Sequence, residues 1–145
     1  MFENWEELKE NCLNCRKCNL CEARSNVVFG VGNPCAKVMF IGEGPGRNED
    51  LKGEPFVGAG GQLLDKYLAA VDLDRRTNIY IANIVKCRPP QNRDPLQEEQ
   101  EACMDWLRNQ TALLRNPAQK PAAFDDFLKL RDKIDELQAD ISKTY

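Results

Sequence analysis

The sequence predicts one domain of the α/β class. Two short apolar runs, at residues 37–42 and 78–85, are typical of buried strands; the first ends in glycine and the second is rich in β-branched side chains. Between them, apolar residues recur at helical spacing from 63 to 71. A strand, a helix and a strand in this order form a βαβ unit with parallel strands and a right-handed crossover. The 145 residues are enough for one hydrophobic core but not for two.

Two further helices are expected on either side of this unit. Apolar residues between positions 2 and 8 fall at helical spacing and predict a short amphipathic helix. After the second strand, Asp94, Pro95 and Gln97 have the pattern of a helix start, with aspartate as N-cap and proline at the first helical position. This second helix is expected to run to about residue 110.

Composition narrows the functional classes. Histidine is absent and the net charge is −3, which excludes imidazole acid/base chemistry and gives no overall attraction to nucleic acid. Locally, however, residues 86–93 carry three positive charges and no acid. No apolar run is long enough to span a bilayer, and the acidic start does not resemble a signal peptide. We therefore expect a cytoplasmic protein without membrane contact.

Seven cysteines predict a site built from thiols. Cys87 and Cys103 lie far along the chain, whereas four others follow one another at an even spacing of three: Cys12, Cys15, Cys18 and Cys21. In a reducing compartment, thiols clustered in this way bind metal more often than they form disulfides. An all-cysteine set suits zinc or an iron–sulfur cluster, and unligated buried thiols are the alternative. Isolated Cys35 is expected to be a packed core thiol.

The segment after the first strand is a second candidate site, because open α/β sheets bind ligands beyond the carboxyl ends of their strands. Residues 42–50, GEGPGRNED, include Glu43, Glu49 and Asp50. The spacing of a dinucleotide-binding loop fails because position 47 is arginine. We expect a flexible turn whose carboxylates place water or stabilise a cation, with solvated loop charges as the alternative.

Four segments together resemble a known family. They are CRKC, GEGPGRNED with GEPFVGAGGQLLD, IYIANIVKCRPPQNRDP, and EACMDWLRNQ. Their order and spacing closely resemble the family 4 uracil-DNA glycosylases, the iron–sulfur branch of the uracil-DNA glycosylase superfamily, over residues 12–110. The resemblance implies a three-layer αβα fold, here truncated to a short parallel sheet remnant. It also implies a DNA repair enzyme that excises uracil from DNA by hydrolysing the N-glycosidic bond.

The resemblance assigns roles to individual residues. It implies a [4Fe-4S] cluster whose ligands are cysteines from three segments: Cys15, Cys18, Cys87 and Cys103. Cys12 and Cys21 fall outside the family's ligand positions. Glu43 matches the residue associated with the attacking water, and Glu49 is a second acidic candidate.

The implied base pocket and DNA contacts follow in the same way. Phe56 would stack on a flipped uracil, and Asn83 would read the edge of the base beside Gly42 and Gly44. The implied phosphate contacts are basic residues of the segment after the second strand: Lys86, Arg88 and Arg93. The implied partner is uracil-containing DNA, single- or double-stranded.

The chain departs from the family in its C-terminal part. The family has a later motif that begins with His-Pro, whose histidine contacts uracil and helps to stabilise its developing charge, and this motif is missing here. Residues 112–145 instead resemble the segment that follows the motif, which suggests an in-frame deletion joined at 112–115. We therefore divide the chain into the front part of the glycosylase-like domain with the cluster ligands, 1–111, and a tail with a long helix, 112–145.

The shortening leads to three further expectations. A short parallel sheet remnant exposes a strand edge, through which self-association is expected. A catalytically inactive iron–sulfur DNA-binding remnant is the alternative to an active enzyme. A small electron carrier or a zinc module is the third hypothesis.

Overall fold

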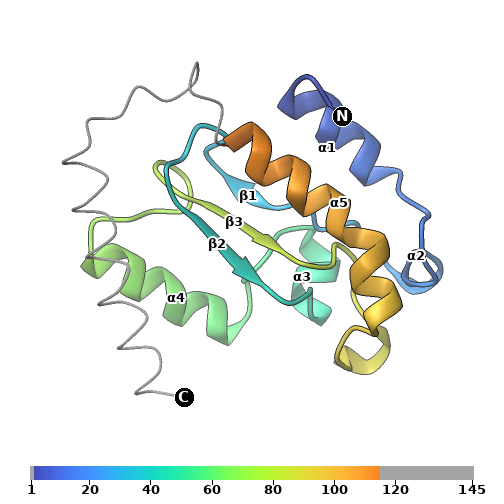
Figure 1. Cartoon of the computed structure of the whole chain (residues 1–145). Coiled ribbons are helices and arrows are strands. Elements are labelled where there is room, and N and C mark those ends of the chain that lie inside the picture. Colours follow the sequence, from blue (N-terminus) through green and yellow to red (C-terminus); the bar gives the residue numbers. More distant parts are fainter. Residues whose placement is uncertain (1, 115–145) are drawn as a thin grey trace.

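The computed structural model describes residues 2–114 of the chain (Figure 1). In chain order the elements are α1 (Trp5–Leu13), α2 (Leu20–Ala23), β1 (Val31–Gly32), β2 (Met39–Gly42), α3 (Arg47–Lys52), α4 (Ala59–Ala70), β3 (Tyr80–Asn83), a 3-10 turn η1 (Pro90–Asn92) and α5 (Gln97–Leu114). None of the helices in this part of the chain is long and apolar enough to cross a membrane.

The sheet has three strands in the order β1-β3-β2. β2 and β3 are parallel, with Gly42 opposite Asn83 at their carboxyl ends. The predicted βαβ unit is thus confirmed, with α4 as its crossover helix. β1 pairs antiparallel with β3 and was not predicted, because two residues are too few for a periodic pattern. The sheet is therefore mixed rather than a purely parallel pair.

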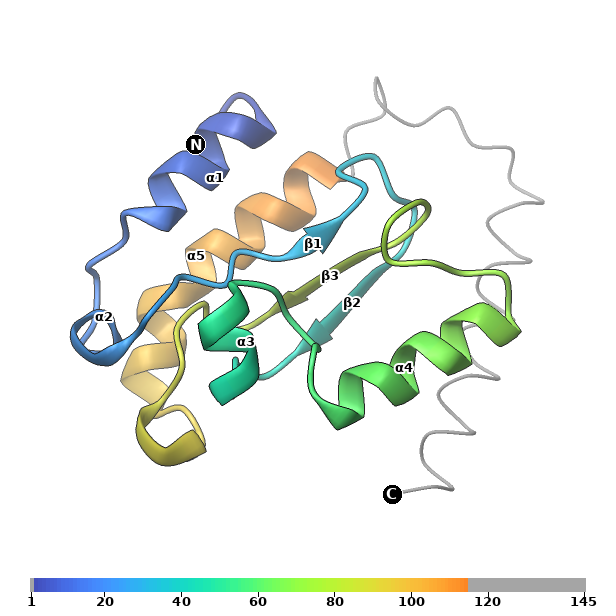
Figure 2. The ribbon, with the colours of Figure 1, turned by 180° about the vertical axis from the view of Figure 1, so that it is seen from behind.

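Helices cover both faces of this sheet (Figures 1 and 2). β3 lies in the middle and all four of its residues are buried. Ile79 and Ile81 pack with the apolar face of α4, whereas Tyr80 and Ala82 pack with α5. This alternation places one helical layer on each side of the sheet, so the expected three-layer α/β arrangement is confirmed.

The N-terminal segment forms a third packed region against α5. Leu8 and Cys12 of α1 are fully buried and belong to one apolar cluster with Trp106 of α5. Trp5 makes edge-on ring contacts with Phe29 and with β3. The predicted amphipathic helix at the N-terminus is therefore confirmed as a packing helix, and it brings the first cysteines next to α5.

Two local expectations need correction. Residues 42–50 do not form a flexible turn throughout, because α3 begins at Arg47 and the buried Asp50 accepts hydrogen bonds from the backbone N–H groups of Ser25 and Asn26. α5 begins at Gln97 rather than Pro95, and the Glu99 carboxylate accepts the N–H of Leu96. α5 also continues past residue 110 to Leu114. The join at 112–115 falls at the edge of the described residues, and the predicted tail helix lies outside them.

Candidate functional site

A pocket of about 290 Å³ opens where the parallel strands β2 and β3 end. It is lined by residues of three segments: Gly44, Glu49, Phe56, Gly58, Ala59, Gly60, Gly61 and Asn83. The position agrees with the rule that open α/β sheets bind ligands at the carboxyl ends of their strands. Three of the residues that the resemblance assigned to the base pocket, Gly44, Phe56 and Asn83, line it together.

Asn83, which lines this pocket, carries a buried hydrogen-bonding group that is not used. Its side chain belongs to the last residue of β3 and is 2% exposed. Its Oδ1 atom is buried and has no hydrogen-bond partner among residues 2–114. An unpaired buried acceptor is costly, about 1–3 kcal/mol, and this makes a donor on a ligand the natural partner.

Gly42 creates the space in which Phe56 and Asn83 meet. A Cβ atom at position 42 would collide with the Phe56 ring and with Oδ1 of Asn83. Gly42 lies directly opposite Asn83 in the sheet register. The glycine is therefore required by close packing of the aromatic ring and the amide on the strand end.

The backbone of Phe56 has an unusual conformation. Its φ is +52°, a left-handed region that a bulky residue adopts only when its surroundings enforce it. A Cβ atom at Gly61 would collide with the Phe56 carbonyl group. Gly61 of α4 thus lets the helix approach the turn closely enough to support that conformation.

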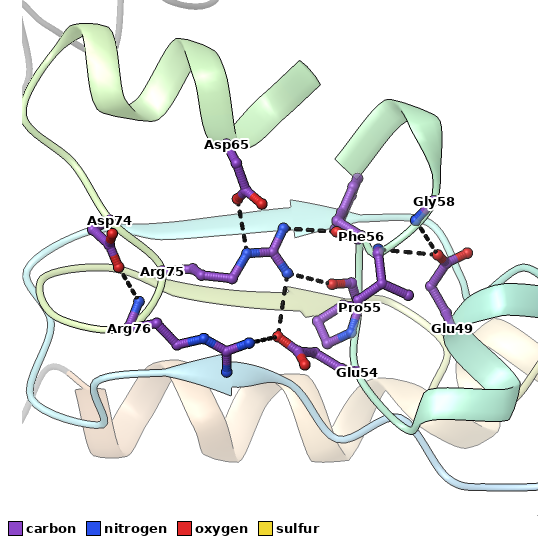
Figure 3. Close-up of polar contacts among 10 residues, drawn as sticks. Glu49, Glu54, Pro55, Phe56, Gly58, Asp65, Asp74, Arg75 and Arg76 are labelled. Atoms are coloured by element: carbon purple, nitrogen blue, oxygen red, sulfur yellow. Dashed lines mark hydrogen bonds and ion pairs between the residues drawn. The ribbon is translucent and has the colours of Figure 1, made fainter. Parts of the chain in front are cut away.

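Glu49 fastens the Phe56 turn to the start of α3. Its Oε1 accepts the N–H of Gly46 at 3.0 Å. Its Oε2 accepts the N–H groups of Val57 and Gly58, both at 3.1 Å (Figure 3). Both carboxylate oxygens are therefore engaged by backbone donors. In this arrangement Glu49 shapes the pocket wall, whereas the sequence suggested an acidic group for chemistry.

Glu43 lies beside this pocket rather than in its lining. The side chain is exposed and lines an adjacent hollow of about 130 Å³ with Pro89, Asn92 and Arg93. Gly44 lines both spaces. The two acidic candidates therefore line different openings, and Glu43 is exposed whereas Glu49 is half-buried.

The three basic residues assigned to phosphate contacts differ in position. Lys86 needs correction, because its side chain is 1% exposed and its Nζ donates to the Asn83 carbonyl at 2.8 Å and to Oε1 of Gln110 at 2.6 Å. Arg93 is exposed but binds Glu99 through both terminal nitrogens, at 2.7 and 2.9 Å. Arg88 donates from Nε to Oδ1 of Asn92. Lys86 therefore supports the backbone behind the pocket instead of facing outward.

Five cysteines line one small cavity between the N-terminal segment, the loop after β3 and α5. They are Cys15, Cys18, Cys21, Cys87 and Cys103. Cys12 is fully buried beside this region, and Cys35 is exposed. The expectation that Cys35 is a core thiol is therefore wrong; it lies in the turn before β2, where Ala36 takes the buried position instead.

Four of these sulfur atoms accept hydrogen bonds. Trp106 Nε1 donates to Cys15 Sγ at 3.3 Å, Arg24 Nη1 donates to Cys87 Sγ at 3.5 Å, and the Lys86 N–H donates to Cys103 Sγ at 3.2 Å. For Cys18, burial raises the pKa of the thiol, and a backbone hydrogen bond from Leu20 offsets part of this rise. The four sulfurs that receive these bonds are those of the four cysteines implied by the resemblance.

Burial works against ionisation of the same thiols. It raises the pKa of Cys103 to about 11 and raises the pKa of Cys18 and Cys87. A bound cation would reverse this preference, because coordination deprotonates a thiol. Among the described residues, no group of three or more cysteine, aspartate, glutamate or histidine side chains is arranged around a single metal ion.

Sequence reasoning missed one residue behind the pocket. Arg75 lies in the turn between α4 and β3 and is buried, with 7% of its surface exposed. Its guanidinium contacts the turn that carries Phe56 (Figure 3). No local pattern signals such a contact, because about twenty residues separate the partners in the chain.

Comparison with known proteins places these features in a family. The profile described as "Uracil DNA glycosylase superfamily" matches residues 29–122. A "Type-4 uracil-DNA glycosylase" of Archaeoglobus fulgidus is 51% identical over 114 residues, which are 79% of this chain and 57% of that protein. One of Thermotoga maritima with the same name is 46% identical over 79% of this chain and 59% of the relative. A "Type-5 uracil-DNA glycosylase" of Thermus thermophilus is 32% identical over 60% of this chain and 45% of the relative. The chain spans about half the length of the curated relatives it matches.

Proposed function

Because the chain belongs to the uracil DNA glycosylase superfamily, we propose that it excises uracil from DNA by hydrolysing the N-glycosidic bond. The observation that carries the proposal is the unpaired, buried Oδ1 of Asn83 in a pocket that also presents the ring of Phe56. Enzymes that act on a base take it out of the stack. A uracil extruded from single- or double-stranded DNA is the substrate that fits this pair of groups.

Asn83 would distinguish uracil from cytosine. The Oδ1 atom can accept the N3–H of uracil while the amide nitrogen donates to O4. Cytosine presents an acceptor at N3 and a donor at C4, so the same side chain would be left unpaired against it. Stacking on Phe56 would add about 1–3 kcal/mol of binding free energy without selecting the base.

Cleavage of the C1′–N1 bond leaves the bonding electron pair on the base. Positive charge develops on the sugar and negative charge on the departing uracil, and fixed dipoles or charges near either centre lower the barrier. Water supplies a hydroxyl group to C1′ and a proton to the uracil, so the products are free uracil and an abasic site. We assign Glu43 to the water, because its carboxylate is exposed beside the pocket, whereas Glu49 is held by three backbone N–H groups.

DNA phosphates would contact the rim of the neighbouring hollow. Arg93 lines that hollow, and Arg88 donates to Asn92 on its edge. Arginine–phosphate contacts give affinity without sequence preference. Lys86 is left out of this surface because its ammonium group is buried.

We also propose that a [4Fe-4S] cluster is held by four thiolates: Cys15, Cys18, Cys87 and Cys103. Two observations indicate that these four cysteines suit a cluster. Their sulfurs line one cavity, and each sulfur accepts a hydrogen bond from an N–H group. Hydrogen bonds to the sulfurs are among the features that tune such clusters. When bound, the cluster would supply a structural cross-link between the N-terminal segment, the loop after β3 and α5.

The test uses purified protein and an oligonucleotide with one uracil. Release of uracil leaves an alkali-labile site, and we expect strand cleavage that Asn83→Ala lowers by at least about tenfold, since a buried hydrogen-bonding pair is lost. Asn109→Ala, on the surface of α5, is the matched control. Glu43→Gln is expected to lower the rate as well, whereas Glu98→Gln on the exposed face of α5 is not.

The second candidate function is DNA binding without catalysis. It is favoured by the absence of histidine together with the coverage of about half of each relative. Oligonucleotide binding without any uracil release would establish it.

We further propose self-association through the outer edge of β2, which has no neighbouring strand within the described chain and carries the half-exposed Ile41. A cytoplasmic location stays a prediction.

A further inference from the structure

We propose that Arg75 is a positioning residue that fixes the backbone of Phe56 and thereby sets its ring against the base pocket. The consequence for uracil rests on the proposed function, whereas the effect on the turn does not. Arg75 is not among the residues that line the pocket. It acts from behind, through the turn that joins α3 to α4.

The guanidinium of Arg75 makes a fork of contacts with this turn. Its Nη1 donates to the Pro55 carbonyl at 2.8 Å and its Nη2 to the Phe56 carbonyl at 2.6 Å (Figure 3). Its Nε donates to Oδ1 of Asp65 on α4 at 2.8 Å, and Nη1 lies 3.4 Å from Glu54. Two consecutive carbonyl oxygens are thus bound by two nitrogens of one planar group, which a lysine could not reproduce.

The turn needs such support because its conformation is unfavourable. Phe56 has a φ of +52°, and a bulky residue remains there only when several contacts hold it. Arg75 holds the two carbonyl groups at positions 55 and 56, and Glu49 holds the two N–H groups at positions 57 and 58. The two charged side chains therefore fix opposite halves of the same short turn.

The same geometry explains how the contact reaches the pocket. The Phe56 carbonyl lies between Arg75 and Gly61, while the ring of Phe56 packs on Gly42 at the strand end. A change of backbone conformation at Phe56 would move the ring away from Asn83. Asp65, whose side chain is 49% exposed, orients Arg75 and therefore affects the Phe56 turn only through Arg75.

The experiment compares Arg75→Ala and Arg75→Lys with Arg76→Ala in the full chain. Arg76 is the matched control, because it pairs with the same Glu54 at 2.8 Å but is 64% exposed. Binding is measured to a single strand with one uncleavable 2′-fluoro-deoxyuridine and to the same strand with 2′-fluoro-deoxycytidine. We expect Arg75→Ala to weaken binding of the uracil strand about tenfold, as loss of a stacking partner does, and Arg76→Ala to change it by less than about twofold.

Amide hydrogen exchange provides a second readout that does not depend on uracil. Exchange at Val57 and Gly58 is expected to accelerate in Arg75→Ala and to recover in part in Arg75→Lys, while β3 keeps its protection. Unchanged exchange in this turn together with unchanged affinity for the uracil strand would overturn the proposal. If the Arg75 variants do not fold, Asp65→Asn decides: the proposal requires faster exchange in the turn, and unchanged exchange refutes it. A wild-type chain without uracil preference would refute the proposed function alone, and the exchange result would still decide the role of Arg75.

Discussion

Gly42→Ala is the sharpest perturbation of the proposed base pocket. The added methyl group would collide with the ring of Phe56 and with Oδ1 of Asn83, so the two groups assigned to uracil could not keep their positions. Gly42 is outside the left-handed region of backbone conformation, and alanine is therefore tolerated by the main chain itself. The change tests side-chain packing in the pocket and leaves the charge of the protein unaltered.

The expected magnitude follows from the contacts that are displaced. Loss of stacking on Phe56 costs about 1–3 kcal/mol, and an unmet hydrogen bond at Asn83 costs about 1–3 kcal/mol. Because the two losses overlap, we expect uracil binding to weaken by about 2–4 kcal/mol, or roughly 30- to 1,000-fold. Overpacking should also lower the free energy of unfolding by about 1–3 kcal/mol.

Gly60→Ala is the matched control for this substitution. Gly60 lines the same pocket, but a Cβ atom there meets nothing within 4 Å. It lies inside α4, where alanine in place of glycine favours the helix by up to about 1 kcal/mol. Binding of the fluorinated uracil strand by fluorescence anisotropy, with urea unfolding of both variants, measures the two effects separately. Wild-type affinity in Gly42→Ala would refute the assignment of this pocket to the base.

Three further outcomes are expected. Cys15→Ser should lower the iron content and the visible absorbance of the purified protein, whereas Cys21→Ser should leave both near wild type; equal losses would contradict the four-ligand set. Arg93 holds the pKa of Glu99 below its usual range, so this pair stabilises the fold above the ordinary carboxyl pKa and the contribution is lost as the pH falls through the lowered value. Urea unfolding between about pH 6 and pH 3 should therefore show a smaller loss of stability in Glu99→Gln than in wild type. Ile41→Lys should shift the chain toward monomer in sedimentation velocity, because a charge on an open strand edge opposes pairing, and an unchanged distribution would exclude this edge as the contact.

Strongly patterned segments were the part of the fold that sequence could predict. The strands that end at Gly42 and Asn83 are apolar runs with a helical segment between them, and the site followed because parallel strands end at one edge. β1 escaped detection, because its two residues are defined by pairing with β3 and not by their own pattern.

Side chains whose roles depend on tertiary contacts could not be predicted. Lys86 lies in a basic segment that resembles a phosphate-binding loop, yet its position after β3 directs it inward to Gln110 on α5. Glu49 resembles an acid beside a reaction centre, but two backbone N–H groups of the turn after α3 donate hydrogen bonds to its carboxylate. Arg75 gave no signal because its partners lie in a different segment.

The cysteine cavity joins parts of the chain that are far apart in sequence. Cys15 and Cys103 both line it, so a group bound to both sulfurs would enclose most of the described domain in one loop. Closing a loop of that length removes conformational entropy from the unfolded chain, which is worth about 4 to 5 kcal/mol in the chain-entropy description of a cross-link. That amount is comparable to the whole stability of a marginal domain. Loss of the bound group would then first increase the population of unfolded molecules, before it changed the base pocket itself.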